Sequence, residues 1–346
     1  MTPHVLALTM GDPAGIGPEI VARTLAEAPA GQQARGIAVG DTIALRRAVS
    51  VSGLDVDVRE IPSFDVAPRA GTIDIVDTGA LGDRPVEWGV VDKRAGRAAV
   101  EAITVATAAA MKGEVAAIVT GPINKEAIWA AGATHLGHTE MLGELTGVTK
   151  QDTMFVVGGG EDGSGHDLKI FFTTRHLSLA TAIQRLSTER ILASIENSIE
   201  ALVVFGLERP RFAVAALNPH GGENGAFGDE ELTMIGPACD LARGLGHDVR
   251  GPIPADSVFH QGLQGRHDAV LSHFHDQGHI AAKTYDFNGT VSVTVGLPIL
   301  RTSVDHGTAF DIAGRGTADA GTMRAAYLAA VRYAPRTAAI RAAYGA

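Results

Sequence analysis

The chain has 346 residues, of which 29 are basic and 39 acidic, so its formal net charge is −10. The charges are dispersed along the sequence, which predicts neither a nucleic-acid partner nor an anionic membrane surface as a partner. A single cysteine excludes an intramolecular disulfide and a CxxC metal site. At this length, and with 45% hydrophobic residues, we expect two domains rather than one.

The N-terminal segment lacks a basic stretch followed by a long apolar run. No segment approaches the roughly 20 apolar residues that are needed to span a bilayer. We therefore expect a cytoplasmic protein, in which any anionic substrate is bound by local cations.

Short apolar runs alternate with longer segments of helical periodicity, which predicts an α/β fold. The runs typical of buried strands are residues 5–10, 37–39, 116–119, 154–157, 169–172, 212–217, 269–274 and 291–295. Helical patterns cover residues 93–112, 188–205, 229–245 and 322–333. Gly113 is a stop signal for the first of these helices. No linker marks a boundary, so we expect one domain from residues 1–135 plus 286–346 and a second from residues 136–285.

A glycine-rich segment, MGDPAGIGPEI at residues 10–20, follows the first predicted strand and precedes a helix. Gly11 and Gly15 allow a tight backbone path, Pro18 suits a first helical turn, and Glu19 complements the helix dipole. The segment is not GxGxxG, so it does not indicate a Rossmann fold. A strand-to-helix turn without chemical function would have the same composition.

A second glycine-rich segment, GGGEDGSGH at residues 158–166, joins two strand-like runs. No helix with a GK[ST] sequence follows it. We therefore expect a hairpin loop here rather than a phosphate-binding loop.

Three histidines follow strand-like runs directly, namely His176, His220 and His275. The carboxyl ends of buried strands are where side chains of an α/β protein converge on a ligand. Neutral imidazoles bind divalent metals and leave the metal charge uncompensated, which makes the metal strongly Lewis acidic. The pattern predicts a metal site, although a single such histidine is more often a hydrogen-bonded turn residue. His273 and His279 lie close to His275, and His279 could support a ligand rather than be one.

The segment SVDHGTAFDIAGRGTADAGT at residues 303–322 is dense in glycine, aspartate and threonine, and is suited to surrounding a nucleotide. Its HGTAFDIAGRG part resembles the adenosine-binding loop of the isocitrate and isopropylmalate dehydrogenases, and GIGPEI resembles their N-terminal signature. The resemblance implies these cofactor contacts: Gly11, Gly15, His306, Gly307, Asp311 and Gly314. No arginine cluster marks a 2′-phosphate pocket, so we expect NAD rather than NADP as the cofactor.

Six further segments are similar to the 4-hydroxythreonine-4-phosphate dehydrogenase family of pyridoxal phosphate biosynthesis. They are TGPINKEA (120–127), GHTEML (137–142), LNPHGGENGAFGDEE (217–231), GPIPADSVF (251–259), HDQGHIAAK (275–283) and GLPILRTSVDHGTA (296–309). ENGAFGDEE, HDQGHI and HGTAFDIA are most similar to the branch that acts on 4-phospho-D-threonate or 4-phospho-D-erythronate. The resemblance covers nearly the whole chain. It implies a two-domain isocitrate/isopropylmalate-dehydrogenase-like fold with the active site in the interdomain cleft.

The same resemblance implies roles for individual residues. It assigns His176, His220 and His275 to a divalent metal shared between the two subunits of a homodimer, with Zn expected before Mg, Mn or Co. The substrate contacts that it implies are His138, Thr139, Lys283, Ser292 and Arg301. The family often has asparagine at the position of Ser292, which puts one substrate hydrogen bond in question. His138 and Thr139 could instead cap a helix. Asp256 and Lys283 are the candidate catalytic residues: Asp256 is a possible base or supporting carboxylate, and Lys283, with Arg301, supplies a cation for the phosphate or carboxylate.

These observations predict an NAD- and divalent-metal-dependent dehydrogenase that oxidatively decarboxylates a 4-phosphorylated 3-hydroxy acid. The candidate substrates are 4-phosphohydroxy-L-threonine, 4-phospho-D-threonate and 4-phospho-D-erythronate. Two alternatives remain open at this point. One is a dehydrogenase of an aromatic cis-dihydrodiol carboxylate on the same fold, and the other is a non-catalytic protein that binds a metal or a nucleotide.

Overall fold

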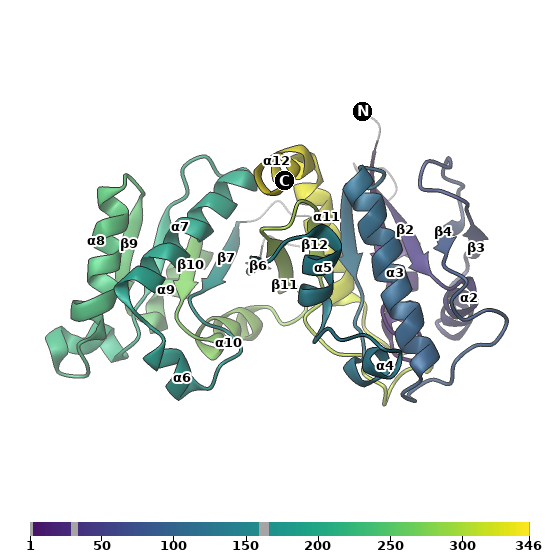
Figure 1. The fold of residues 1–346 in the computed structure, drawn as a ribbon, viewed down its shortest axis with the longest axis horizontal. Coiled ribbons are helices and arrows are strands. Elements are labelled where there is room, and N and C mark those ends of the chain that lie inside the picture. The colour runs from purple at the N-terminus through teal and green to yellow at the C-terminus, as the bar shows by residue number, and fades with distance from the viewer. Residues whose placement is uncertain (1–2, 29–33, 159–165, 346) are drawn as a thin grey trace. The chain divides into compact units, whose positions relative to one another are not determined.

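The structure is a computed structural model that describes residues 3–28, 34–158 and 166–345. The chain divides into two compact units (Figure 1). The first unit comprises Met1–Asp152 and Val291–Ala346, and the second comprises Thr153–Thr290. The sequence analysis placed its divisions after residues 135 and 285. Each unit is an arrangement of helices on a largely parallel sheet, which confirms the predicted α/β class.

The first unit contains seven strands in the order β3-β4-β2-β1-β5-β12-β11. They are β1 (His4–Thr9), β2 (Ala34–Gly40), β3 (Asp57–Glu60), β4 (Thr72–Asp77), β5 (Ala117–Thr120), β11 (Val291–Val295) and β12 (Leu300–Ser303). All neighbours are parallel except β11 and β12. The predicted strands at 5–10, 37–39, 116–119 and 291–295 are confirmed. The sequence analysis missed β3, β4 and β12, because polar residues dominate or interrupt them.

The longest helix of the first unit is α3 (Lys93–Lys112), with the bounds expected from its periodicity. The side chain of Asp92 accepts a hydrogen bond from the backbone N–H of Arg94 at its start, and Gly113 ends it in the left-handed conformation. The other helices of this unit are α1 (Gly17–Ala26), α2 (Thr42–Val51), α4 (Lys125–Ala130), α5 (His138–Thr146), α11 (Gly321–Tyr333), the 3₁₀ turn η3 (Ala334–Arg336) and α12 (Thr337–Tyr344). The prediction of a helix over residues 322–333 is thereby confirmed.

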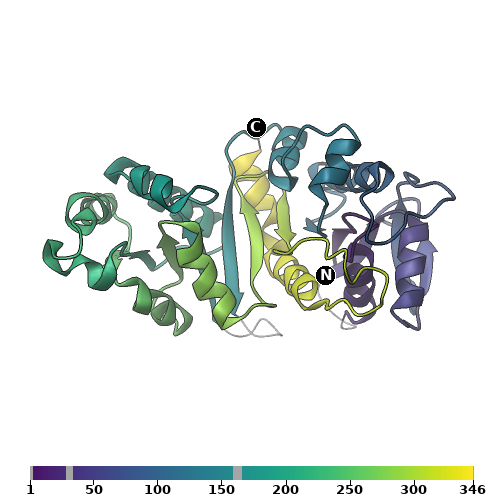
Figure 2. The same ribbon diagram turned by 90° about the horizontal axis from the view of Figure 1, so that it is seen from below.

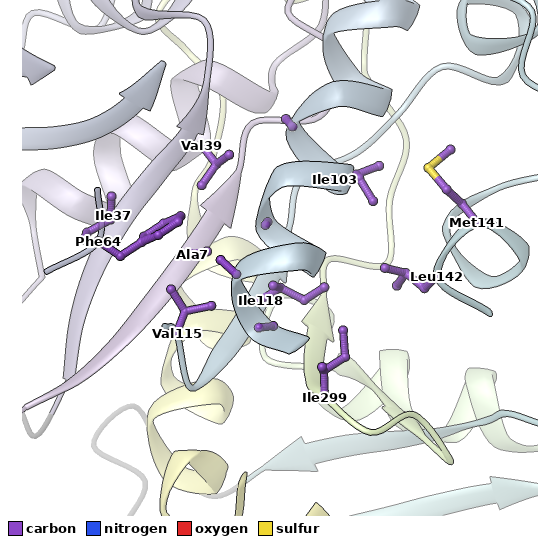
Figure 3. Close-up of a cluster of buried hydrophobic side chains, with 14 of the residues drawn as sticks. Ala7, Ile37, Val39, Phe64, Ile103, Val115, Ile118, Met141, Leu142 and Ile299 are labelled. Atoms are coloured by element: carbon purple, nitrogen blue, oxygen red, sulfur yellow. The ribbon is translucent and has the colours of Figure 1, made fainter. Parts of the chain in front are cut away.

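The core of the first unit lies on both faces of its sheet. Figure 3 shows one side, where Ala7, Val39 and Ile118 from three neighbouring strands pack with Ile103 of α3. Alternate residues of the strands face the other side, which α1 and α11 cover. Figure 2 shows α11, in yellow, lying along the last two strands. Complete burial of each large aliphatic side chain in such a core contributes about 1.5–3 kcal/mol.

The second unit contains five strands in the order β6-β7-β10-β8-β9. They are β6 (Asp152–Gly158), β7 (Asp167–Phe172), β8 (Phe212–Ala215), β9 (Val249–Ile253) and β10 (Ala269–Ser272). β6 and β7 pair antiparallel, as the predicted hairpin requires, and the remaining neighbours are parallel. Residues 159–165 of the hairpin loop lie outside the described residues.

The helices of the second unit are α6 (Leu179–Gln184), α7 (Thr188–Val204), α8 (Gly236–Gly244), α9 (Ala255–Leu263) and α10 (His275–Tyr285). A 3₁₀ segment, η1 (Pro219–Gly225), and a π-helical turn, η2 (Glu231–Ile235), complete it. The helix predicted over 229–245 is divided between η2 and α8, because Pro237 has no N–H to donate to the preceding turn. Within the described ranges, no helix combines the length and apolar character needed to cross a membrane.

Candidate functional site

The three predicted metal ligands leave one edge of the second unit's sheet. β10 lies between β7 and β8, and the three strands are parallel, so their carboxyl ends are neighbours. His176 follows β7, His275 follows β10, and His220 follows β8. The strand arrangement therefore has the geometry that the sequence pattern suggested for a ligand-binding edge.

Two of these histidines lie close to each other. The ring centroids of His176 and His275 are 6.0 Å apart. Nδ1 of His275 is 2.7 Å from the carboxylate of Asp276, which favours a proton on Nδ1 and leaves the lone pair of Nε2 available to a ligand. His279 stacks on His275 with centroids 3.7 Å apart, and its Nδ1 lies 2.9 Å from the His275 carbonyl oxygen. His279 is therefore placed to support His275.

His273 has a structural function. Its Nε2 lies 2.7 Å from the carbonyl oxygen of Ala215, and its own carbonyl accepts a hydrogen bond from the hydroxyl of Thr174. It thereby joins the ends of β8, β10 and the segment after β7. Burial lowers the pKa of His273 to about 4, so the ring is neutral at pH 7. These contacts make His275 the better candidate for a ligand.

His220 lies in a loop with an uncommon backbone. Residues 220–224 all have positive φ, and three of them are not glycine. The carboxylate of Glu231 holds this loop by accepting the backbone N–H groups of Leu217 and Asn218 at 2.8 and 2.7 Å. Burial opposes ionisation of Glu231, but the hydrogen bonds from Asn218 outweigh it and lower the pKa of the carboxyl. The His220 ring contacts Phe227, and its Nδ1 lies 3.3 Å from Glu223.

Among the residues described, no three histidine, cysteine, aspartate or glutamate side chains of one chain are grouped closely enough to hold a metal. The structure thus brings His176 and His275 together but does not join His220 to them. The three-histidine metal site stays a prediction, and in that prediction two subunits of a dimer contribute the ligands.

The first unit carries a row of hydroxyl side chains that the sequence analysis missed. Thr9 of β1 is in register with Thr120 of β5, Thr120 with Ser303 of β12, and Ser303 with Ser292 of β11. Residues in register share one face of a sheet, so the four hydroxyls form a line across the strand ends. Thr120 donates to Ser303 at 3.1 Å, whereas the buried hydroxyl of Thr9 has no hydrogen-bond partner among the residues that the structure describes. Ser292 belongs to this row.

Arg301 of β12 lies on the same face of the sheet as this row of hydroxyls, two positions before Ser303. It is 6% exposed, and its guanidinium donates to the hydroxyls of Thr120, at 2.7 and 3.1 Å, and of Thr294, at 3.1 Å. No carboxylate of the described residues is within ion-pair distance of it. Burial lowers the pKa of Arg301 to about 10. A buried cation without a counter-ion is costly, so this position favours an anionic ligand.

His138 is the first residue of α5, and it lies near Arg301. Burial, and then the positive charge of Arg301, lower the pKa of His138 well below its ordinary value. Within the described ranges, its buried Nε2 has no hydrogen-bond partner. The N-cap residue of α5 is Gly137, and no side chain caps this helix, so the capping function considered for His138 and Thr139 is wrong. The carbonyl of Thr139 accepts a hydrogen bond from Gln151.

The two segments that resemble cofactor-binding motifs, residues 10–20 and 303–322, pack closely against each other. A Cβ added at Gly15 would lie 2.8 Å from the Thr308 backbone, and one at Gly11 would lie 2.1 Å from the Pro122 carbonyl oxygen. The backbone N–H of Gly314 donates to Glu19 at 2.6 Å. Gly11, Gly15 and Gly314 thus allow close backbone approach, and their contact with a cofactor stays a prediction.

The remaining candidates are more exposed. Nδ1 of His306 lies 2.9 Å from the carbonyl oxygen of Gly307, and no atom would crowd a Cβ at Gly307. Asp311 is exposed. Asp256 is exposed in the first turn of α9. Lys283 follows His275 by eight positions on α10, about two turns along the helix, and its Nζ lies 5.6 Å from the Phe287 ring centroid.

Asp12 is a buried carboxyl that the sequence analysis did not single out. Its Oδ1 accepts a hydrogen bond from the backbone N–H of Ala14 at 2.8 Å, while its buried Oδ2 has no partner in the described part of the chain. Burial, with a smaller contribution from Asp92, raises the pKa of Asp12 to about 6. No local sequence signal distinguishes it from a turn aspartate.

Comparison with known proteins identifies relatives along the whole chain. The family model described as "Pyridoxal phosphate biosynthetic protein PdxA" matches residues 32–330. A protein of Cutibacterium acnes named "Putative D-threonate 4-phosphate dehydrogenase" is 51% identical over 342 residues, which cover 98% of this chain and 96% of that protein. The solved 4-hydroxythreonine-4-phosphate dehydrogenase of Klebsiella pneumoniae has 41% identity and a TM-score of 0.85, with 96% and 98% of the two chains covered. A terephthalate 1,2-cis-dihydrodiol dehydrogenase of Burkholderia xenovorans LB400 has 30% identity and a TM-score of 0.63, with 95% and 98% covered.

Proposed function

The chain belongs to the PdxA family of dehydrogenases, and we propose that it oxidises the C3 hydroxyl of D-threonate 4-phosphate with NAD. The name of the Cutibacterium acnes relative supports this substrate. D-Erythronate 4-phosphate and 4-phosphohydroxy-L-threonine are the next candidates, the latter because of the solved Klebsiella pneumoniae relative.

One observation carries the proposal. Arg301 is a buried cation without a carboxylate partner, and His138 beside it has a buried Nε2 without a hydrogen bond. An anionic, polyhydroxylated ligand bound there would supply both a counter-ion for Arg301 and a hydrogen-bond partner for His138. Its phosphate or carboxylate would accept from Arg301, and the polar groups of the ligand would bond to His138 and to the free Thr9 hydroxyl. Ser292 is in register with Ser303, and Thr139 follows His138 on α5, so both would complete this set.

The histidines of the second unit fit a divalent metal by their chemistry. Nε2 of His275 is available because Nδ1 is engaged by Asp276, and the His176 ring lies nearby. We propose that His220 completes the ligand set through a second copy of the chain. A metal bound there would lower the pKa of the C3 hydroxyl and stabilise the charge that develops during the reaction. Neutral imidazoles favour zinc, with Mg, Mn or Co as alternatives.

The residues of the chain then have separate tasks. Lys283, on the same helix as His275, accepts the hydroxyl proton, and Asp256 is the alternative base. Arg301 and His138 hold the phosphorylated acid in position. Hydride passes from C3 to NAD, which the loop at residues 306–314 would bind. Because C3 is β to the carboxylate, the keto acid that results loses carbon dioxide and takes up a proton at C2.

A homodimer is part of the proposal. The second unit exposes several large apolar side chains on α6 and α10: Leu179, Ile183, Ile280 and Tyr285. Helix α10 also carries His275, so a partner that covers α10 would lie next to the proposed ligands. Apolar side chains exposed in this way are typical of surfaces that another chain covers.

The proposal is tested by following NADH formation with D-threonate 4-phosphate, in the presence of zinc or after chelation. We expect turnover only with metal, loss of zinc from His275→Ala, and retention of zinc by His260→Ala, which removes an exposed histidine of α9. Absence of metal-dependent NADH formation with all three phosphorylated acids would contradict the proposal.

The Burkholderia xenovorans relative makes a cis-dihydrodiol carboxylate the second candidate substrate. Inorganic phosphate separates the two candidates, because a pocket for a phosphorylated acid is inhibited competitively by phosphate and a diol pocket is much less affected. Bound zinc without any hydride transfer would instead support a non-catalytic binding protein.

A further inference from the structure

The guanidinium of Arg301 is oriented by hydroxyl groups of the two strands beside it. Its Nε and Nη2 donate to one oxygen, Oγ1 of Thr120 on β5, at 3.1 and 2.7 Å. Its Nη1 donates to the hydroxyl of Thr294 at 3.1 Å, and Thr294 is the register partner of Arg301 on β11. Arg301 on β12 is thus held from both sides, and two of its three hydrogen bonds depend on the single hydroxyl of Thr120.

The hydroxyl of Thr120 uses its full hydrogen-bonding capacity. A threonine hydroxyl has one donor and two acceptor lone pairs. Both lone pairs accept from Arg301, and the proton is donated to Oγ of Ser303 at 3.1 Å. Ser303 in turn donates to the carbonyl of Val304 at 2.9 Å. The side chains of Arg301, Thr120 and Ser303 are buried, and hydrogen bonds that run in one direction through such a site strengthen one another.

Hydroxyl groups orient a cation without neutralising its charge. A carboxylate at the position of Thr120 would form an ion pair with Arg301, and an anionic ligand would have to compete with it. A guanidinium has five N–H donors, of which Thr120 and Thr294 accept three within the described ranges. One donor on Nη1 and one on Nη2 remain. Two donors on neighbouring nitrogens match two oxygens of one carboxylate or phosphate.

We propose that Thr120 is a positioning residue for Arg301: it holds the guanidinium so that the remaining Nη1 and Nη2 donors bind one anionic group of the substrate through two hydrogen bonds. The proposal rests on the proposed function in taking Arg301 as the residue that binds this anionic group. Ser303 acts one step further away, by accepting the proton of Thr120. The sequence analysis included Thr120 in the segment at residues 120–127 and gave it no function.

The test compares Thr120→Val, which keeps the shape of the side chain and removes the hydroxyl, with Thr120→Ser, which keeps the hydroxyl. The measurements are KM and kcat for D-threonate 4-phosphate with NAD, and the Kd of inorganic phosphate by calorimetry on the full chain. We expect Thr120→Val to raise KM and Kd by at least about tenfold, the effect of one hydrogen bond to a charged group. Its kcat should change by less than about threefold, because the anion is bound equally in the ground and transition states. Thr120→Ser should stay within about threefold of the wild type in all three quantities. An unchanged KM and Kd in Thr120→Val would overturn the proposal.

Two buried threonines serve as matched controls. Thr107→Val removes a hydroxyl of α3 that has no hydrogen-bond partner in the described part of the chain. Thr302→Val removes a hydroxyl that donates to the carbonyl of Ala326 at 2.8 Å, next to Arg301 in sequence but on the other face of β12. Both variants should keep the KM and the phosphate Kd of the wild type, although Thr302→Val should unfold at a lower urea concentration. A rise of the phosphate Kd in Thr302→Val as large as that in Thr120→Val would show a general effect of the strand and overturn the proposal.

A double-mutant cycle tests whether Thr120 acts through Arg301. Lysine keeps the charge but lacks the planar pair of donors, so Arg301→Lys should raise the phosphate Kd by itself. Adding Thr120→Val to Arg301→Lys should then raise it by less than about threefold more, whereas independent effects would multiply and overturn the proposal. If Thr120→Val does not fold, Ser303→Ala takes its place, because it leaves the Thr120 proton without its acceptor. It should raise the phosphate Kd at least about threefold, and an unchanged Kd would overturn the proposal.

Binding of inorganic phosphate does not depend on turnover, so the two proposals can fail separately. Oxidation of the phosphorylated acid, together with phosphate binding that Thr120→Val leaves unchanged, would refute the positioning function of Thr120 and leave the proposed function intact. Phosphate binding that depends on Thr120 and Arg301, with no oxidation of any phosphorylated acid, would support the positioning function and contradict the proposed function.

Discussion

Replacing Arg301 by methionine should change the ligand-free protein little and abolish its response to anions. Burial lowers the pKa of Arg301 to about 10, and this shift from its ordinary value corresponds to a cost of about 3 kcal/mol for the charged form. The substitution removes this cost, and it also removes three hydrogen bonds from the charged guanidinium to Thr120 and Thr294, each worth about 1.5 kcal/mol net at the lower end of the usual range. The two effects largely offset each other, so the free energy of unfolding should fall by no more than about 2 kcal/mol. Removing one member of a buried ion pair would instead cost about 3–5 kcal/mol.

The assay is urea unfolding of wild type and Arg301→Met, with and without D-threonate 4-phosphate. A ligand at about one hundred times its Kd stabilises the wild type by about 2.7 kcal/mol, and this increment should be absent from the variant. The control is Arg35→Met, which breaks an ion pair with the buried Asp74 and should lower stability while keeping the ligand response. A loss of 3 kcal/mol or more by ligand-free Arg301→Met, or a full ligand response in that variant, would refute the reasoning.

Two further predictions concern the glycine-rich segments. Because the pKa of Asp12 is raised to about 6 from 3.8, the folded state binds a proton more tightly than the unfolded state, and stability falls as the pH rises from about 4 to 6. Asp12→Asn keeps the acceptor for Ala14 and should remove this dependence, worth about 3 kcal/mol, in urea unfolding at pH 4 and 7.5; an unchanged pH dependence would contradict the assignment. Gly15→Ala should lower the free energy of unfolding by about 1–3 kcal/mol, because its Cβ meets Thr308 at 2.8 Å. Gly307→Ala, which meets no atom within 4 Å, should change it by less than about 0.5 kcal/mol, and equal losses in both variants would count against the packing explanation.

Local patterns predicted much of the fold. Helix α3 has the bounds expected from the sequence, because its periodicity, Asp92 cap and Gly113 stop are all local signals. Strands β3 and β4 could not be predicted in the same way. Their exposed or charged residues, with Asp74 paired to Arg35 and Arg59, give no apolar run to detect. β12 was missed because it carries the buried Arg301.

Less of the candidate site than of the fold could be predicted from the sequence. The strand-end position of His275 is visible in the sequence, and the resemblance to a known family suggested Arg301. The hydroxyl row of Thr9, Thr120 and Ser303 was not visible, because a single hydroxyl at a strand end is ordinary and the row depends on the register of distant strands. The absence of a carboxylate beside Arg301 among the described residues likewise depends on how distant segments pack, so it is not visible in the sequence. The sequence analysis preferred His275 to His273 as a ligand; His273 bonds to Ala215 in the structure, and the role of His275 as a ligand stays a prediction.

The position of β12 next to β5 has a consequence for the synthesis of the protein. Arg301 and its hydrogen-bond partner Thr120 are 181 positions apart, and the whole second unit is encoded between them. At about 5–20 residues per second, a ribosome needs about 10–40 seconds to pass from one to the other. During that interval β12 has not yet been synthesised, so the edge of β5 that later pairs with β12 has no neighbour. The segment Thr153–Thr290 can already fold in the same interval, because it is contiguous. The nascent first unit is thus the part of the chain most in need of protection by a chaperone.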